Sequence, residues 1–333
     1  MNNKTSGDWR PTAALEVLRL RARLLESIRA FFSERGVLEV ETPILSAAAV
    51  TDPMLASLAT RYTGPLFPRG QTFFLHTSPE FPMKRLLAAG SGSIYQIGRV
   101  FRDGEAGRLH NPEFTMLEWY RVGFDHHRLM DEVAELVMQL LAPTQSLEAP
   151  ERISYREVFR RHAGLDPHTA TSADFAAAAR ERRISVPKDL TSQNDLATWR
   201  DLLLTHAVEP KLGQGRLTFI YDFPAAQASL ARILPGEPPL AARFELYLNG
   251  IELANGFHEL ADADEQRARF ERQLHARAAG GQAVVPVDER LLAALSEGLP
   301  DCAGVALGFD RLVMLAAGAR SIAEVMAFPV DRA

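Results

Sequence analysis

The sequence predicts an α+β fold in which helices flank an antiparallel sheet. Two stretches carry this prediction, because residues 93–120 and 243–259 each read as two β-strands joined by a turn. Apolar residues at helical spacing flank them, most clearly at 12–36, 125–141 and 264–278. With 333 residues, the chain is long enough for one large domain or two ordinary ones.

The composition is that of an ordinary globular protein. It is 47% hydrophobic and 24% charged, with a net charge of -5, so it lacks the overall basic character that wholesale nucleic-acid binding usually needs. Cys302 is the single cysteine, which excludes an internal disulfide and fits a reducing cytoplasm. We expect no signal peptide and no membrane span, because no apolar run is long enough for either.

The first expected element is an amphipathic helix after a disordered lead at residues 1–12. Apolar residues from Leu15 to Phe32 fall near helical spacing, and Gly36 is suited to end the helix. A short strand is expected at 37–42. The apolar stripe favours a core helix, and a dimer interface is the alternative.

Residues 55–77 read as two short strands around a loop that contains Gly and Pro. A helix is expected next, with Ser78 as its N-cap and Pro79 in its first position. Glu80 would then lie in the first turn. There it would either complement the helix dipole or face a cationic ligand.

The hairpin at 93–120 carries a cationic loop. Arg102, Arg108, His110 and Asn111 lie between its two apolar runs. A guanidinium binds phosphate oxygens in pairs, so this loop suits an anion such as a triphosphate. An ordinary exposed hairpin with solvated charges is the alternative.

The middle of the chain is expected to contain a clear helix, a linker and a helical insertion. The helix is the one at 125–141, and residues 142–152 read as a Pro-containing linker. Short helical patterns then occupy 153–215, and a strand follows at 216–223. The helical patterns cover residues 154–161, 172–183 and 192–208.

The second hairpin carries carboxylates. Asn249-Gly250 is the strongest short hairpin signal in a sequence. Glu245, Glu252 and Glu259 follow one another at intervals of seven, on or beside this hairpin. Carboxylates near a nucleotide normally hold Mg²⁺, whereas any one of them alone is most simply an exposed strand charge.

The last informative segment is a small-residue strand at 304–308 that turns at Gly308 into a helix bearing Arg311. The helix N-terminus and the guanidinium could both serve a phosphate, and close helix–strand packing is the alternative. The sequence shows no Walker-type loop, dinucleotide fingerprint or nucleophile elbow. His126 and His127 are adjacent and the histidines lack metal-ligand spacing, so we predict no zinc site.

Three blocks resemble, in order, the signature motifs of class II aminoacyl-tRNA synthetases: residues 14–43, 101–114 and 304–311. The similarity is closest to the lysyl branch. It is carried by TSPE at 77–80, RLHNPEFT at 108–115, EWY at 118–120 and ELANGF at 252–257. The resemblance implies one catalytic domain over 13–333, with a helical insertion at about 153–215.

Two features differ from lysyl-tRNA synthetases. We expect the N-terminal anticodon-binding barrel to be absent, since only about a dozen residues precede the catalytic domain. Ala306 stands where lysyl synthetases typically carry Gly, and its methyl group would trim the amino-acid pocket. Both features resemble the elongation factor P–(R)-β-lysine ligases, a family of synthetase paralogues.

The resemblance implies a site for ATP, Mg²⁺ and a lysine-like acid. Arg102 would be the catalytic residue, contacting the substrate carboxylate and the α-phosphate. The implied ATP-binding residues are Arg102, Gly104, Glu105, His110, Asn111, Phe114, Glu252, Leu253, Gly308 and Arg311. The implied substrate-binding residues are Ser78, Glu80, Glu118, Tyr120, Asn255, Phe257, Glu259 and Ala306. Glu245 and Glu252 would hold Mg²⁺.

Individual roles follow from the same resemblance. Phe114 would stack on adenine, and Arg311 would bind the γ-phosphate side of ATP. Glu80 would bind the backbone-side amine of the substrate, whereas Glu118, Tyr120 and Glu259 would bind the distal amine. The family usually has Glu two residues after the motif arginine. Here Gly104 occupies that position, and the neighbouring Glu105 is the candidate replacement.

The activity that the resemblance implies is ATP-dependent activation of (R)-β-lysine and its transfer to a lysine of elongation factor P. A cytoplasmic homodimer without stable tRNA binding is expected with it. Two alternatives remain open at this point. One is a truncated lysyl-tRNA synthetase that charges tRNA, and the other is a non-enzymatic paralogue that binds a ligand.

Overall fold

A computed structural model describes residues 9–187, 190 and 195–333. The expected disorder of residues 1–8 and the expected helix start at Ser192 therefore lie outside the described residues. Tertiary contacts divide the chain into two compact units. Unit 1 comprises the described part of residues 1–123 with 261–302 and 306–333, and unit 2 comprises 124–260 and 303–305.

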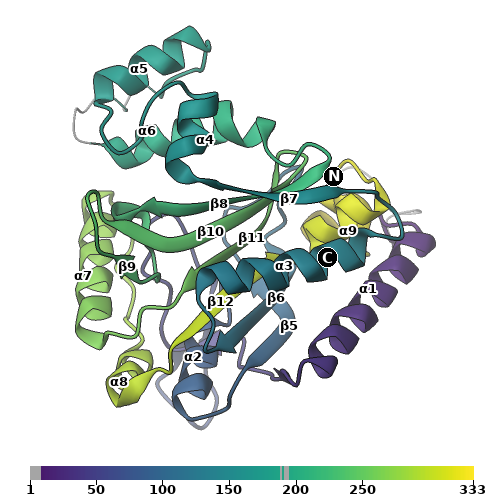
Figure 1. Ribbon diagram of the computed structural model, residues 1–333. Coiled ribbons are helices and arrows are strands. Elements are labelled where there is room, and N and C mark those ends of the chain that lie inside the picture. Colours follow the sequence, from purple (N-terminus) through teal and green to yellow (C-terminus); the bar gives the residue numbers. More distant parts are fainter. Residues whose placement is uncertain (1–8, 188–189, 191–194) are drawn as a thin grey trace, which may run out of the picture. The chain divides into compact units, whose positions relative to one another are not determined.

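Unit 1 is built around the predicted long hairpin, which is confirmed. Strands β5 (Ile94–Phe101) and β6 (Glu113–Val122) pair antiparallel along their whole length (Figure 1). Strand β1 (Leu38–Glu39) adds to β5 in parallel. It follows helix α1 (Leu15–Glu34), which ends as predicted before Gly36, whose φ is +63°.

The two faces of β6 have different environments. On one face, Trp119 is fully buried and its ring centre lies 5.4 Å from that of Phe32 in α1. Side chains alternate along a strand, so the even-numbered residues 114–120 lie on the other face. Thus one side of the hairpin anchors α1, and the other carries the predicted nucleotide and substrate residues.

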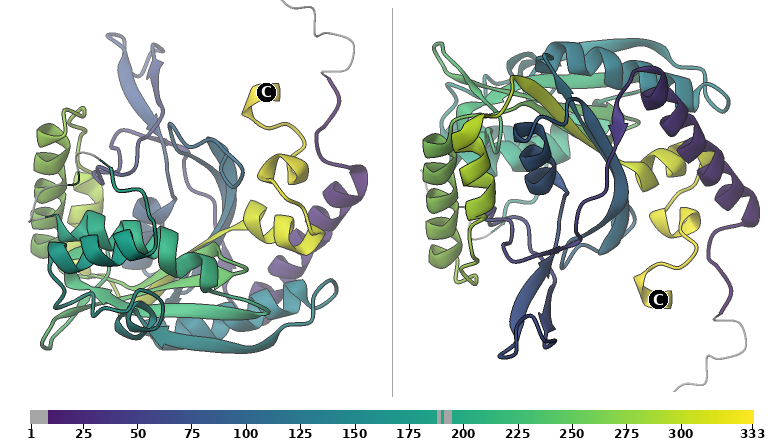
Figure 2. Two further views of the ribbon diagram at one scale, coloured as in Figure 1. Left: turned by 90° about the horizontal axis from the view of Figure 1, so that it is seen from above. Right: turned by 90° about the horizontal axis from the view of Figure 1, so that it is seen from below.

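The remaining elements of unit 1 complete an α+β arrangement. A separate sheet has the order β2-β4-β3, and Figure 2 shows its β3–β4 hairpin projecting from the rest of this unit. Helix α2 packs on α8, and α9 packs on α1 and β6. The bounds are β2 Leu45–Ser46, β3 Ala59–Tyr62, β4 Gln71–Leu75, α2 Glu80–Ala88, α7 Ala263–Ala279, α8 Glu289–Gly298, α9 Phe309–Ala317, η4 Ile322–Val325 and η5 Val330–Arg332.

A buried carboxylate joins three elements of unit 1. Asp310, in the first turn of α9, is 1% exposed and accepts a hydrogen bond from the backbone N of Thr115 at 2.6 Å. Asp310 also forms an ion pair with Arg21 of α1. Arg21 in turn donates to Oγ1 of Thr115 at 2.6 Å. This network, the Asp310 network, fixes α1, β6 and the start of α9 against one another.

Unit 2 contains the second predicted hairpin. Strands β10 (Leu240–Leu248) and β11 (Ile251–His258) are joined by Asn249 and Gly250, whose φ angles of +53° and +71° fit a type I′ turn. The hairpin prediction is therefore confirmed. The sheet continues to β8 (Arg216–Pro224), which is antiparallel to β10.

The edge of this sheet was not anticipated. Strand β7 (Glu148–Ser154) pairs in parallel with β8, so the interpretation of residues 142–152 as a linker is wrong from Glu148 onward. Strand β9 (Ile233–Leu234) pairs with β10. Strand β12 (Cys302–Gly308) leads into α9, and its residues 303–305 group with unit 2. The α+β prediction is confirmed, with mainly antiparallel strand pairs.

Helices cover the unit 2 sheet. Helix α3 begins after Asp125, whose side chain caps it, and contacts β10 and β11, whereas α4 contacts β7 and β8. The short helices expected between 153 and 215 are present, and Figure 1 shows α4, α5 and α6 grouped together. Phe159, Phe175 and Trp199 share one hydrophobic cluster with Ile220 and Tyr247. The bounds are α3 His126–Leu141, α4 Tyr155–His162, α5 Ser172–Glu181, α6 Leu196–Leu203, η1 Leu204–Val208, η2 Glu209–Lys211 and η3 Ala225–Gln227.

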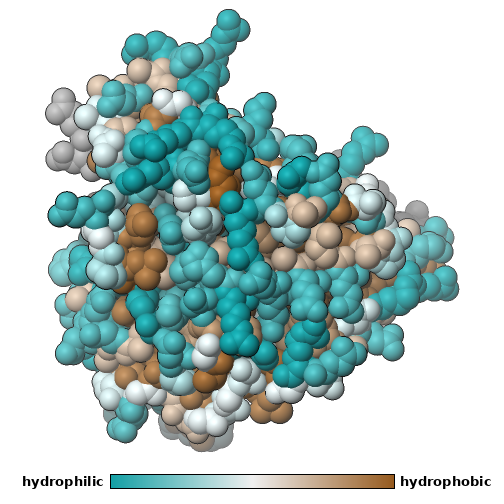
Figure 3. Space-filling model, in the orientation of Figure 1, coloured by the Kyte–Doolittle hydropathy of each residue, from teal (hydrophilic) through white to brown (hydrophobic). Residues whose placement is uncertain are grey.

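The described helices do not have the character of membrane spans. Within residues 9–187, 190 and 195–333, none combines the length and the apolar composition that crossing a bilayer requires. The face drawn in Figure 3 is mostly hydrophilic, with apolar side chains in small groups.

Gly213 offers a test of the unit 2 packing. Its φ is +67°, and an added Cβ would lie 2.5 Å from Cα of Leu248 and 2.7 Å from the carbonyl oxygen of Tyr247. We expect Gly213→Ala to lower the free energy of unfolding by about 2–4 kcal/mol, because backbone strain adds to overpacking. Gly215 has φ +72° but nothing within 4 Å of an added Cβ, so Gly215→Ala is the matched control. Chemical denaturation that shows equal losses would contradict the clash.

The Asp310 network offers a second test. Replacing Asp310 with Asn leaves Arg21 next to a neutral amide, and removal of one partner of a buried ion pair costs about 3–5 kcal/mol. The control is Glu16→Gln, since the Glu16–Arg19 pair on α1 is exposed, with 3.8 Å between its atoms. That variant should change the free energy of unfolding by less than about 0.5 kcal/mol. Similar denaturation midpoints for the two variants would show that the network is unimportant.

Candidate functional site

Arg102 lies at the end of β5 over an aromatic ring. Its backbone N donates to the carbonyl oxygen of Pro112 at 2.8 Å, which closes the base of the loop between β5 and β6. Its guanidinium carbon lies 5.1 Å from the centre of the Phe114 ring. Among the described residues, its buried Nε has no hydrogen-bond partner. A buried donor left without a partner costs free energy, and an anion bound here would recover it.

Glu105 lies beside the motif arginine. An oxygen of its carboxylate is 3.5 Å from Nη1 of Arg102. Gly104 has φ +78°, the left-handed conformation that favours glycine, so this residue serves the turn between them. The structure thus places the Glu105 carboxylate beside the guanidinium of Arg102. Its contact with adenine stays a prediction.

Arg311 and His110 are in direct contact. Nη2 of Arg311 lies 2.7 Å from Nε2 of His110, and its Nε donates to the carbonyl oxygen of Leu109 at 3.4 Å. A guanidinium can only donate, so Nε2 of His110 must accept, and a neutral ring carries its proton on Nδ1. This contact places the arginine of the third motif against the loop of the second.

The same loop is held by the C-terminal segment. Asn111 is buried; its Nδ2 donates to the carbonyl oxygen of Glu113 at 2.6 Å, and its Oδ1 accepts from the backbone N of Val330 at 3.0 Å. The backbone N of Ile322 donates to the carbonyl oxygen of Arg108 at 2.8 Å. Both ends of the Asn111 amide are therefore engaged by the backbone. Its contact with ATP stays a prediction.

Glu118 forms the centre of the predicted amine pocket. It is 2% exposed, and its carboxylate accepts from Oγ of Ser78 and from the hydroxyl of Tyr120, both at 2.7 Å. These two donors are neutral hydroxyls, so they orient the carboxylate without supplying a positive charge. Such an arrangement suits a ligand ammonium group.

Glu80 already has a cationic neighbour. Nζ of Lys84, a residue that is 2% exposed, donates to Oε1 of Glu80 at 2.7 Å. The backbone N of Glu80 donates to Oγ of Ser78 at 3.0 Å, but α2 begins at Glu80 with Pro79 as its N-cap. The prediction of Ser78 as N-cap and Pro79 in the first helical position is therefore wrong by one residue. A substrate amine at Glu80 would share the carboxylate with Lys84.

Glu245 is the most constrained carboxylate of unit 2. It is 6% exposed and accepts from Nη2 of Arg243 and the hydroxyl of Tyr247, both at 2.6 Å, and from Nδ2 of Asn255 at 3.2 Å. Burial raises the pKa of Glu245, and the nearby Glu252 raises it further, against the lowering effect of Arg243. A cation that compensated this negative charge would favour the ionised form.

A β-bulge decides which side chains join Glu245. The turn places Glu252 opposite Tyr247, yet Glu245 lies opposite Asn255, so Leu253 is an extra residue in β11. Opposed residues share a face, and therefore Glu252 and Asn255 lie on the face of Glu245. Leu253 itself is 2% exposed.

These carboxylates fit Mg²⁺. Mg²⁺ prefers oxygen ligands and is usually bound through one or two carboxylates together with phosphate oxygens. Glu245 and Glu252 present two carboxylates on one face, and their mutual repulsion would be relieved by a divalent cation. Glu252 is more exposed than Glu245, so it is the more accessible ligand.

Sequence reasoning missed Arg243 and Tyr247. Arg243 donates to Glu245, to Oδ1 of Asn255 at 3.3 Å and to the carbonyl oxygen of Gln227 at 2.8 Å, and so organises this face. The sequence of β10 contained a signal that could have identified both residues. Arg243, Glu245 and Tyr247 occupy every second position, which puts all three on one face.

The other predicted residues have simple surroundings. Phe257 lies with its ring centre 5.9 Å from the guanidinium carbon of Arg243. Glu259 is 1% exposed, Ala306 is partly buried in β12, and Gly308 is the N-cap of α9. The predicted residues thus divide between the two units. Unit 1 holds Ser78, Glu80, Arg102, Gly104, Glu105, His110, Asn111, Phe114, Glu118, Tyr120, Ala306, Gly308 and Arg311, and unit 2 holds Glu245, Glu252, Leu253, Asn255, Phe257 and Glu259.

Comparison with known proteins matches nearly the whole chain. Residues 3–332 match the model of the family described as tRNA synthetases class II (D, K and N). A Yersinia enterocolitica protein named "Elongation factor P--(R)-beta-lysine ligase" is 52% identical over 328 residues, covering 98% of this chain and 99% of that protein. Proteins of the same name from Klebsiella pneumoniae and Salmonella paratyphi B are 53% and 52% identical over 325 residues, covering 98% of both chains in each case.

The site geometry and the comparison with known proteins lead to one conclusion. The motif arginines, Glu118 with its two hydroxyl donors, and the carboxylate face occur in a chain that matches the family over almost its full length. The chain therefore belongs to the class II tRNA synthetase family of the D, K and N type.

Proposed function

We propose that this protein activates (R)-β-lysine with ATP and transfers the β-lysyl group to a lysine ε-amine of elongation factor P. Relatives that bear this activity in their names, at 52–53% identity over 98% of the chain, support the substrates. One structural observation carries the chemistry. Arg102 is held over Phe114 with a buried Nε donor that lacks a partner among the described residues, which suits a bound anion.

In the first step, a carboxylate oxygen of β-lysine attacks the α-phosphorus of ATP. The bond from that phosphorus to the bridging oxygen breaks, which gives the β-lysyl adenylate and pyrophosphate. Arg102 donates to the phosphoryl oxygens as charge grows on them, and such preorganised donors are usually a large term in catalysis. Arg311, fixed by His110 and Leu109, is assigned to the terminal phosphates.

Recognition of the substrate is assigned to acidic residues. A dicationic acid suits Glu118, which is oriented by neutral hydroxyl donors, and Glu80 and Glu259 would add negative charge. A site that pairs a polar group strongly rejects analogues that lack it. Glu245 and Glu252 would hold Mg²⁺, which neutralises phosphate charge when bound.

In the second step, the lysine ε-amine of elongation factor P attacks the acyl carbon of the adenylate. An amide bond forms, the acyl–phosphate bond breaks, and AMP leaves as the amine loses a proton to solvent. No protein nucleophile is needed in either step. Because the acceptor is a translation factor, the reaction belongs in the cytoplasm, and stable tRNA binding is not part of the proposal.

A homodimer is part of the proposal. In unit 1, large apolar side chains are exposed on and just after α1: Leu15, Leu38, Ile44 and Leu45. Exposed large apolar side chains are candidates for a subunit interface. The apolar stripe of α1 itself is buried in unit 1 at Leu24, Ile28, Phe31 and Phe32, so the core prediction for this helix is confirmed.

ATP–pyrophosphate exchange with (R)-β-lysine tests the activation step. We expect Arg102→Ala to lower exchange by about 100-fold or more, because it removes a donor to the reacting phosphate. Arg99→Ala is the matched control, since Arg99 lies on the same strand in an exposed pair with Glu113. It should stay within about twofold of the unchanged protein. Exchange with neither β-lysine nor α-lysine would refute the enzyme, and full activity of Arg102→Ala would refute its role.

Substitution at Ala306 tests the choice of amino acid and acceptor. Ala306→Gly removes the methyl group. It should raise the rate of α-lysine exchange relative to β-lysine exchange by about tenfold, which is the usual effect of one such group on discrimination in a pocket. The mass of elongation factor P after incubation should increase by one β-lysyl group with the unchanged protein. Lysine transfer to tRNA without any change in that mass would instead support the truncated synthetase.

A further inference from the structure

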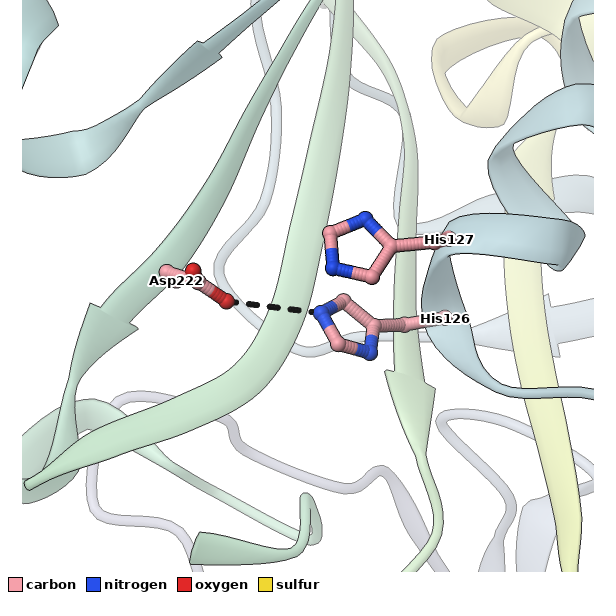
Figure 4. A group of neighbouring side chains, drawn as sticks. All are labelled: His126, His127 and Asp222. Carbon is pink, nitrogen blue, oxygen red and sulfur yellow. Dashed lines mark hydrogen bonds and ion pairs between the residues drawn. The ribbon is translucent and has the colours of Figure 1, made fainter. Parts of the chain in front are cut away.

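Two histidines and an aspartate converge in unit 2, away from the residues assigned above. His126 and His127 are the first residues of α3, and Asp222 lies near the end of β8 (Figure 4). One ligand atom from each of the three lies within 4.8 Å of the others. Figure 4 shows both imidazole rings extending from the helix toward the strand that carries Asp222.

The closest pair of this cluster is spaced like two metal ligands. Nε2 of His126 lies 3.3 Å from Oδ1 of Asp222, which is long for a hydrogen bond between a charged carboxylate and an imidazole. Tetrahedral Zn²⁺ with bonds of about 2.0 Å separates its ligands by about 3.3 Å. The same spacing therefore accommodates either a proton or a metal ion between the two atoms.

His126 is a buried side chain with spare capacity. It is 3% exposed, and its Nδ1 has no hydrogen-bond partner among the described residues. No partner on Nδ1 dictates which nitrogen carries the proton, so the lone pair of Nε2 can face Asp222. A lone pair that faces a carboxylate oxygen requires a cation between them.

Local structure holds the three side chains in place. Asp125 caps α3 by accepting from the backbone N of Arg128 at 2.8 Å, which fixes the two histidines at the helix start. Asp222 has φ +59°, an uncommon conformation for a residue other than Gly. It lies where the pairing between β8 and β10 shifts register. His127 is exposed, so its ring can move to complete a coordination shell.

The cluster lies on the opposite face of the sheet from Glu245. Ile220 is opposite Glu245, so the next residue, Tyr221, points to the other face. The ring centre of His127 lies 5.4 Å from that of Tyr221. His258 shares a face with Gly256, which is opposite Phe244, and its ring centre lies 6.4 Å from that of His126.

We infer that His126, His127 and Asp222 form a binding site for a transition-metal ion of the Zn²⁺ type. Two imidazoles and a carboxylate are ligands that Zn²⁺ and its neighbours in the first transition row accept, with water in the fourth position. The ion would join α3 to β8 and so stabilise unit 2. The sequence-based expectation of no zinc site considered only spacing along the chain, whereas these ligands come from segments 96 residues apart.

Metal titration tests the site directly. The full chain, without a histidine tag, is stripped with a chelator and titrated with Zn²⁺ against a chromophoric competitor, and Co²⁺ absorption reports the coordination geometry. We expect one Zn²⁺ per chain, tetrahedral Co²⁺ bands, and a thermal midpoint raised by about 5 °C in excess Zn²⁺. No binding by the unchanged chain would overturn the inference.

Matched variants locate the ion. His127→Ala and Asp222→Asn should each weaken Zn²⁺ binding at least about tenfold and remove the thermal shift. Asn tolerates the left-handed conformation, so Asp222→Asn removes the charge with little effect on the fold. His206→Ala is the control, because His206 is an exposed histidine in the same unit. Unchanged binding in the first two variants, or equal loss in the control, would place the ion elsewhere and refute the site.

Discussion

The buried pair between Asp310 and Arg21 is the constraint on which unit 1 depends. Asp310 precedes Arg311, and Thr115, its second partner, follows Phe114. Neighbouring residues of a strand point to opposite faces, so an anchor on the α1 face of β6 fixes the aromatic ring on the opposite face. The network thus sets the spacing between the arginine of α9 and the hairpin that carries Arg102. A carboxylate outside the proposed chemistry thus helps to fix the geometry of the groups to which that chemistry is assigned.

Unit 2 uses a different device, an irregular strand pair. Arg243, Glu245 and Tyr247 share a face because β10 is regular, and Asn255 joins them because β11 is not. Burial in this group makes the negative charge of Glu245 costly, which raises its pKa. Three donors orient the carboxylate nevertheless, and one of them, Arg243, also supplies a positive charge. The bulge at Leu253 and the buried carboxylate of Glu245 thus lie close together in the same strand pair.

Local signals predicted the elements that local chemistry determines. The Asn249-Gly250 turn, the capped helix after Asp125 and the hairpin around Arg102 depend on residues close in sequence, and all are present.

Strand β7 was missed because Pro150 lies within it and its partner strand is distant in sequence. Regular pairing counted from the Asn249-Gly250 turn would place Ala254 opposite Glu245. The bulge places Asn255 there instead, and no residue type in β11 predicts that bulge. Ion pairs such as Arg21–Asp310, 289 residues apart, were beyond any pattern in the chain. Which candidate site residues touch a ligand stays a prediction.

The anchoring of the loop by the C-terminal segment has a consequence for biosynthesis. Asn111 is held by a backbone group 219 residues later in the chain, and Arg108 contacts the carbonyl oxygen of Arg320, 212 residues later. A ribosome therefore completes β5, β6 and the whole of unit 2 before it makes the segment that orders this loop. A nascent or truncated chain can bury most of its core and still lack a fixed loop. The nucleotide binding proposed for this loop would therefore become possible only late in translation.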